Sequence, residues 1–77
     1  MAKLRRLSGQ EAIRILKRLG FVQIRQRGSH VILTQQTPEG KVGCVVPLHR
    51  QLAIGMLRGI LRQAKVSPDQ FMERVKG

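Results

Sequence analysis

Three short β-prone runs lie between two helical segments, and the spacers between these runs constrain the fold more than any other feature. The runs are expected at residues 21–27, 29–36 and 41–47. Gly28 alone separates the first two, and Thr37-Pro38-Glu39-Gly40 is a turn by composition. A parallel pair needs a crossover of roughly a dozen residues or more, so these spacers predict an antiparallel meander.

Side-chain alternation assigns the faces of the runs. The first run is expected to place Val22 and Ile24 on one face, opposite Gln23, Arg25 and Arg27. The third run ends at Pro47, which cannot donate to a central ladder.

Helical periodicity appears before and after the strands. Ser8 and Glu11 form a capping box at the start of a helix over residues 8–19, and Gly20 stands where a left-handed residue would end it. A second helix is expected over residues 52–64, in which Gly55 and Gly59 would allow close packing. Ser67-Pro68-Asp69-Gln70 is a start signal for a short terminal helix.

This order predicts an α+β fold, α-β-β-β-α with a small helical appendage. Its three-stranded antiparallel sheet should carry the helices on one face. A chain of 77 residues is expected to form a single domain, residues 1–77.

Charge indicates the kind of partner. The chain has 15 Lys and Arg against four Asp and Glu, a formal net charge of +11. A solvated surface explains most charge runs, but self-repulsion of this size destabilises a compact chain and favours a polyanionic partner. A membrane surface is the alternative to nucleic acid, although the first helix has no Trp or Phe to anchor it.

Several kinds of chemistry lack the residues they need. One cysteine, Cys44, excludes an internal disulfide, and one Cys with two His cannot supply four zinc ligands. The four acids stand far apart in sequence, unlike the clustered carboxylates of two-metal nucleases. We therefore expect no metal and no cofactor, and a buried, inert Cys44 rather than a nucleophile.

Targeting signals are also missing from the sequence. No apolar run approaches the roughly 18 residues that span a bilayer. The basic start, Met1–Arg6, is not followed by an apolar h-region, so no signal peptide is expected. The expected location is the cytoplasm.

The scarcity of aromatic residues narrows the choice of nucleic acid. There is no Trp or Tyr and only two Phe, both at core-like positions. Readers of single strands stack bases on exposed rings, so this chain should recognise phosphates, the 2′-hydroxyl and shape. Double-stranded-RNA-binding domains do this and share the α-β-β-β-α order. A DNA-binding helix-turn-helix does not fit the three central strands.

Gly28-Ser29-His30 is the candidate catalytic constellation. Alternation places His30 with Ile32 and Thr34, so it can be a half-buried packing residue. The functional alternative is metal-free RNA cleavage, in which a base takes the 2′-OH proton and an acid protonates the leaving 5′-oxygen. The unperturbed pKa of histidine, about 6.5, suits both transfers.

Basic side chains on neighbouring strands would stabilise the charge on the phosphate. Arg25, Arg27 and Lys41 are expected to surround His30. His49 can be a second proton-transfer group, a phosphate contact or a loop residue without a role. The full set expected to bind RNA is Arg25, Arg27, Ser29, Lys41, His49, Arg50, Arg58 and Arg62.

The sequence resembles the HicA family of toxins, small RNA-cleaving proteins of bacterial and archaeal toxin–antitoxin systems. The similarity lies in Gly20-Phe21, in Arg25-Gln26-Arg27-Gly28-Ser29-His30, in Val46-Pro47-Leu48-His49 and in residues 55–64. Met56 departs from the threonine that many members have there.

The resemblance implies a double-stranded-RNA-binding-like fold, metal-free cleavage of mRNA with His30 as catalytic residue, and a HicB-type antitoxin as partner. The expected function is therefore an endoribonuclease toxin. A non-catalytic RNA-binding module remains the alternative, since it needs only the same charge and fold with a structural His30.

Overall fold

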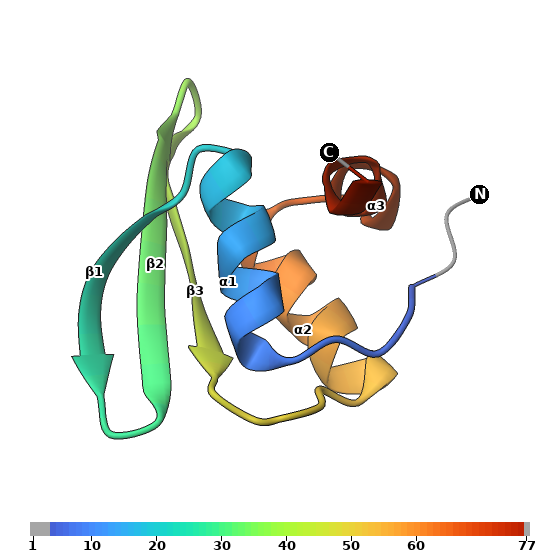
Figure 1. Ribbon diagram of the computed structural model, residues 1–77. Helices are drawn as coiled ribbons and strands as arrows, with labels where there is room; N and C mark the ends of the chain where they lie inside the picture. Colours follow the sequence, from blue (N-terminus) through green and yellow to red (C-terminus); the bar gives the residue numbers. More distant parts are fainter. Residues whose placement is uncertain (1–3, 77) are drawn as a thin grey trace.

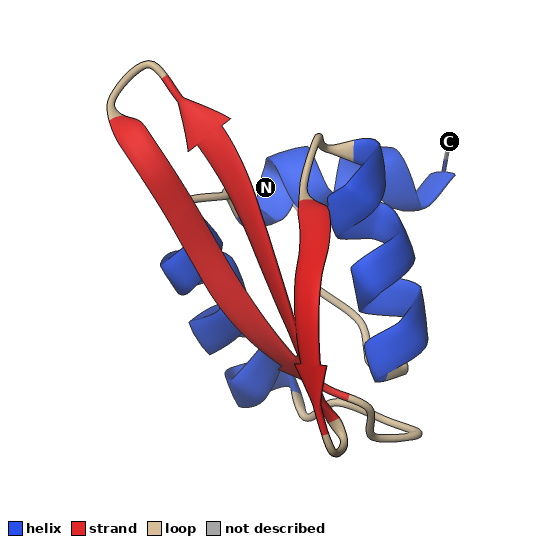
Figure 2. Ribbon diagram, turned by 90° about the vertical axis from the view of Figure 1, so that its left-hand side faces the viewer, coloured by secondary structure: helices blue, strands red, loops and turns tan. Residues whose placement is uncertain are grey.

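The computed structural model describes residues 4–76 and contains three helices and three strands (Figure 1). In chain order these are α1 (Gly9–Arg18), β1 (Val22–Arg27), β2 (His30–Thr37), β3 (Gly40–Pro47), α2 (Ile54–Ala64) and α3 (Pro68–Lys76). The strands form one antiparallel sheet in the order β1-β2-β3, with the helices on one face (Figure 2). The expected α+β architecture is confirmed. Met1–Lys3, part of the basic start considered above, lies outside the described residues.

Local hydrogen bonds explain where α1 begins and ends. The Ser8 hydroxyl accepts from the backbone N–H of Glu11 at 3.0 Å, and the Glu11 carboxylate accepts from the Ser8 N–H at 2.9 Å. The bond from the Ser8 backbone N–H, followed by that to the Ser8 side chain, lowers the pKa of Glu11 from its ordinary 4.5. Gly20 has φ of 102°, the left-handed conformation predicted for the end of this helix.

The strands pair as a meander with one irregularity. β2 and β3 pair without interruption from Thr37 opposite Gly40 to His30 opposite Pro47. Between β1 and β2 the register shifts at Ile24, which is the extra residue of a β-bulge.

This bulge overturns the faces predicted for β1. The register places Val22, Arg25 and Arg27 opposite the outward-facing residues of β2, so these three share one face. Val22 and Ile24 are 61% and 54% exposed and do not form an apolar face against the core. The prediction was wrong because strict alternation fails where one strand carries an extra residue.

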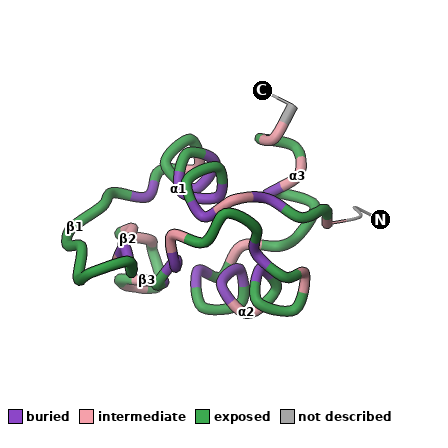
Figure 3. The backbone as a smooth tube through the Cα atoms, turned by 60° about the horizontal axis from the view of Figure 1, so that its bottom comes forward, coloured by how far each residue is buried: buried purple, intermediate pink, exposed green. Residues whose placement is uncertain are grey.

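The hydrophobic core consists of buried residues from the sheet and from all three helices. Figure 3 marks the buried positions along the backbone. β2 contributes Val31 and Leu33 to the core, while the residues that alternate with them face away from the helices. Phe71 joins α3 to the same core and is fully buried. The core also contains Leu16 of α1, Cys44 and Val46 of β3, and Leu57, Ile60, Leu61 and Ala64 of α2. Within residues 4–76, no helix covers the opposite face of the sheet, here called the outer face (Figure 2).

Gly55 and Gly59 of α2 do not make the close packing contacts that the sequence predicted. A Cβ atom at Gly55 or Gly59 would meet nothing within 4 Å. The helix presents these positions on its open side, because Leu57, Ile60 and Leu61 face the core. Their cost in helix propensity is therefore not offset by a close contact at either glycine.

Candidate nucleic-acid interface

A two-residue turn delivers His30 to the start of the central strand. Arg27 and His30 pair directly across the β1–β2 hairpin, leaving Gly28 and Ser29 as its loop. Gly28 has φ of 57° and open space around it, so the turn needs glycine for its backbone conformation and not for room. The Gln26 side chain donates to the Gly28 carbonyl at 3.0 Å and braces the same turn.

The side chain of His30 is exposed on the outer face of the sheet. Its neighbour Val31 is 2% exposed and points to the opposite, core side. The alternative of a half-buried packing histidine is therefore wrong. Because the outer face carries no helix, the imidazole is accessible to a ligand as large as a nucleic acid (Figure 2).

Two arginines are the cationic neighbours of His30 on this face. Arg27 of β1 lies directly opposite His30 of β2. Arg25 of β1 lies opposite Ile32, one position farther along the face. Side chains directly opposite have Cβ atoms about 4.5–5.5 Å apart, and diagonal neighbours about 7–8 Å apart. An imidazole and two guanidinium groups can therefore act on a single phosphodiester.

The segment that follows β3 is tied to the His30 turn. The Leu48 N–H donates to the Ser29 carbonyl at 2.7 Å, and the Leu52 N–H donates to the Leu7 carbonyl at 2.6 Å. The exposed side chains of His49 and Arg50 lie in this segment. The structure thus holds them at the end of the sheet that carries Ser29 and His30.

Gly9 packs against the same segment and was not identified from the sequence. Its N–H donates to the His49 carbonyl at 2.9 Å, and a Cβ on Gly9 would collide with the Pro47 carbonyl oxygen. Pro47 in turn lies opposite His30. The available signal was a glycine placed inside a helix start, where it costs helix propensity. The hydrogen bond from the Gln26 side chain to the Gly28 carbonyl had no such signal in the sequence.

Lys41 does not lie near His30, contrary to the prediction. It pairs with Gln36, which is six residues along β2 from His30, a distance of about 20 Å at about 3.3 Å per residue. The prediction was wrong because adjacency of strands was taken for adjacency of side chains. Antiparallel pairing runs β3 back along β2, so the residue that follows the β2–β3 turn lies at the far end.

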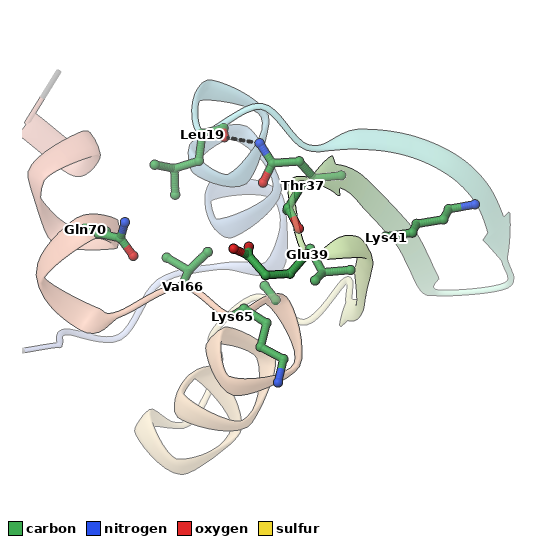
Figure 4. Close-up of a pocket in the computed structure, with 10 residues that line it drawn as sticks. Leu19, Thr37, Glu39, Lys41, Lys65, Val66 and Gln70 are labelled. Carbon is green, nitrogen blue, oxygen red and sulfur yellow. Dashed lines mark hydrogen bonds between the residues drawn. The ribbon is translucent and has the colours of Figure 1, made fainter.

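A cavity of about 660 Å³ occupies that far end. Its lining includes Thr37 and Glu39 of the hairpin and Lys65 after α2. Figure 4 shows the Glu39 carboxylate directed into the cavity and the ammonium groups of Lys41 and Lys65 directed away from it. This arrangement is unlike the cationic outer face around His30.

Arg58 and Arg62 also lie apart from His30. They line a small groove of about 200 Å³ with Leu61, Val66 and Pro68, between α2 and α3. The side of α2 that faces the sheet edge is a different one, since Gln63 accepts there from the Val45 N–H at 3.3 Å. The structure therefore places these arginines on a second basic surface.

Cys44 is buried as predicted. Its side chain is 3% exposed in β3, and burial raises the pKa of its thiol from 9.0 to about 11. A thiol in this state is protonated at neutral pH and is a poor nucleophile.

Within residues 4–76 no three His, Cys, Asp or Glu side chains gather into a group able to hold a metal ion. No helix of this range has both the length and the apolar character needed to cross a membrane.

Comparison with known protein families gives a match over most of the chain. A family model described as HicA toxin of bacterial toxin-antitoxin matches residues 9–66, which is more than half of the chain. The matched range runs from the first residue of α1 to just beyond α2 and contains the whole sheet. No curated protein matches the chain.

Proposed function

The chain belongs to the HicA family of toxins of bacterial toxin–antitoxin systems, and from this premise we propose that it is a metal-independent endoribonuclease that cleaves mRNA. The observation that carries the proposal is the exposed imidazole of His30 beside Arg27 and Arg25 on the open face of the sheet.

In the proposed reaction a base removes the proton of a 2′-hydroxyl, and the resulting oxygen attacks the adjacent phosphorus. The bond from phosphorus to the 5′-oxygen breaks, and an acid protonates that oxygen. The products are a cyclic phosphate and a 5′-hydroxyl, so the step consumes no co-reactant. His30 performs proton transfer, and Arg25 and Arg27 stabilise the charge that develops on the phosphate oxygens.

His49 is the proposed counterpart of His30 or a phosphate contact. The Leu48 and Gly9 hydrogen bonds hold the backbone around it at the His30 end of the sheet. Ser29 and Arg50 lie in the same region and complete the proposed RNA contacts on this side. Lys41, Arg58 and Arg62 would contact more distant parts of an RNA, because they lie at other places on the surface.

The net charge of +11 supports RNA as the ligand. If about four to six phosphates are contacted, log K should fall with log[salt] at a slope of about −3 to −4. A HicB-type antitoxin is the proposed protein partner, in the cytoplasm where mRNA is accessible.

Substitution of His30 by alanine tests the catalytic role. Because the side chain is exposed and outside the core, His30→Ala should unfold at the same temperature as the parent and still bind RNA. Its cleavage rate should fall by about 10²–10⁴-fold, the usual contribution of general acid–base catalysis. Undiminished cleavage by His30→Ala would refute the role of His30.

Two further measurements separate the alternatives. Cleavage should persist in EDTA and leave a cyclic phosphate on the upstream fragment; loss in EDTA with recovery in Mg²⁺ would contradict the metal-free reaction. Arg27→Ala should reduce cleavage more than Lys41→Ala, because Lys41 lies about 20 Å along the sheet. RNA that is bound at low salt but stays intact would favour the non-catalytic module.

A further inference from the structure

The two edges of the sheet differ in how they are covered. The β3 edge is closed by α2, where the Gln63 side chain accepts from the Val45 N–H, and Pro47 has no N–H to offer. Strand β1 forms the other edge, and all six of its residues are exposed. Figures 1 and 3 show β1 as the strand farthest from α2.

The register indicates which main-chain groups of β1 lack a partner strand. The Val45 N–H donates to Gln63 of α2, so it points away from β2. Ile32 of β2 pairs with Val45 and therefore directs its own main-chain N–H and C=O groups to the other side, toward β1. There it pairs with Arg25. Antiparallel pairs alternate between bonded and non-bonded positions. The N–H and C=O groups of Gln23 and Gln26 therefore point outward from the sheet.

The exposed side chains of β1 are two aliphatic residues, two arginines and two glutamines. Val22 and Ile24 are the two most exposed large hydrophobic residues described, and Arg25 and Arg27 follow them in the same strand. An RNA could contact the arginines, but it offers no complement to aliphatic side chains. An extended polypeptide complements the main-chain groups, the aliphatic side chains and, if it is acidic, the arginines.

Charge distinguishes between possible polypeptides. A second copy of the chain also carries a net charge of +11, and pairing β1 with β1 would bring four arginines together at the edge. We propose that the β1 edge binds an acidic extended segment of a partner polypeptide, which adds to the sheet as a fourth strand.

The source of this segment is the antitoxin, and that assignment rests on the proposed function. An acidic strand paired with β1 engages Arg25 and Arg27, the cationic neighbours of His30. Binding of this acidic strand therefore makes Arg25 and Arg27, the groups proposed to hold the scissile phosphate, unavailable to RNA. The same edge then serves recognition of the partner and inhibition.

Amide hydrogen exchange in isotope-labelled protein tests the proposal with a short synthetic peptide in which glutamate alternates with valine. The His30→Ala protein is used, so that the result does not depend on RNA cleavage. A saturating concentration of the peptide should slow hydrogen exchange at the backbone amides of Gln23 and Gln26. A peptide with lysine in place of glutamate should leave them unprotected. Equal effects of both peptides, or no protection at these amides, would overturn the proposal.

Substitutions at one exposed position provide a matched pair. Ile24→Glu and Ile24→Lys remove the same apolar surface from a position 54% exposed, so both should fold. Ile24→Glu should weaken binding of the acidic peptide at least about tenfold more than Ile24→Lys, because it adds a like charge. Equal losses would contradict the charge complementarity.

Hydrogen exchange at the same backbone amides also tests two other occupants of the edge, a second copy of the chain and an RNA. Protection of Gln23 and Gln26 that grows with protein concentration alone would assign the edge to a second copy. Protection by an RNA oligonucleotide equal to that by the acidic peptide would assign it to nucleic acid. Either result overturns the proposal, while cleavage by the parent protein remains a separate test of the enzyme.

Discussion

Replacing Gly9 with alanine should destabilise the protein, although alanine is the better helix former. Gly9 is the first residue of α1 and lies against the end of β3, where a Cβ would overlap the Pro47 carbonyl oxygen and approach the Leu48 Cα to 3.0 Å. Both neighbours are backbone atoms, so no side chain can rotate away. Either α1 or the segment after β3 must shift.

Three contributions set the magnitude. Overpacking costs about 1–3 kcal/mol, and weakening of the Gly9 N–H bond to His49 costs up to about 1 kcal/mol. The helix propensity of alanine offsets at most about 1 kcal/mol. The last two contributions are similar in size and opposite in sign, so the net loss in the free energy of unfolding is close to the overpacking cost, about 1–3 kcal/mol. This corresponds to a fall in Tm of roughly 5–20 °C for a domain of this size.

Urea and thermal unfolding measure this change, with Gly59→Ala as the control. At Gly59 a Cβ meets nothing within 4 Å, so alanine should raise the free energy of unfolding by about 1 kcal/mol. The same substitution thus has opposite signs at two helical positions. A Gly9→Ala protein as stable as the parent, or more stable, would refute the argument from close approach.

Three further predictions concern the core, a helix cap and the buried thiol. Phe71→Ala should cost about 3–5 kcal/mol in urea unfolding because a fully buried ring that joins α3 to the core is lost; a cost near zero would show that α3 does not need this contact. Glu11→Gln should be less stable than the parent above pH 4.5, because the folded-state pKa of Glu11 is lowered, and the difference should disappear as the pH falls through that lowered pKa. A pH-independent difference in unfolding midpoints would contradict this linkage. At neutral pH Cys44 should react with iodoacetamide only as fast as the protein opens, since its thiol is buried and its pKa is about 11; fast labelling of folded protein would contradict its burial.

The secondary structure was predictable because its signals are local. The Ser8 and Glu11 pair marks a helix start through bonds between residues three apart, and both bonds are present. Gly20 at the end of α1 and the glycine turn before His30 are likewise decided by backbone conformation over a few residues. Spacers too short for a crossover then left only the antiparallel meander.

The candidate site was predictable only in part. Arg27 was placed beside His30 correctly, because a two-residue turn leaves one possible pairing across it. Lys41 was misplaced, since its neighbours depend on how β3 runs back along the whole length of β2. The face of Val22 was also wrong, because the bulge at Ile24 shifts the register without any mark in the sequence.

Tertiary packing decided the remaining features through contacts between distant parts of the chain. Gly9 matters because α1 meets the Pro47 carbonyl, and the β1 edge is open because α2 covers β3 instead. Alternation, capping and turn chemistry act over a few residues and specify which elements form. Which side chains then meet depends on register and on which edge a helix covers, and those are properties of the folded chain.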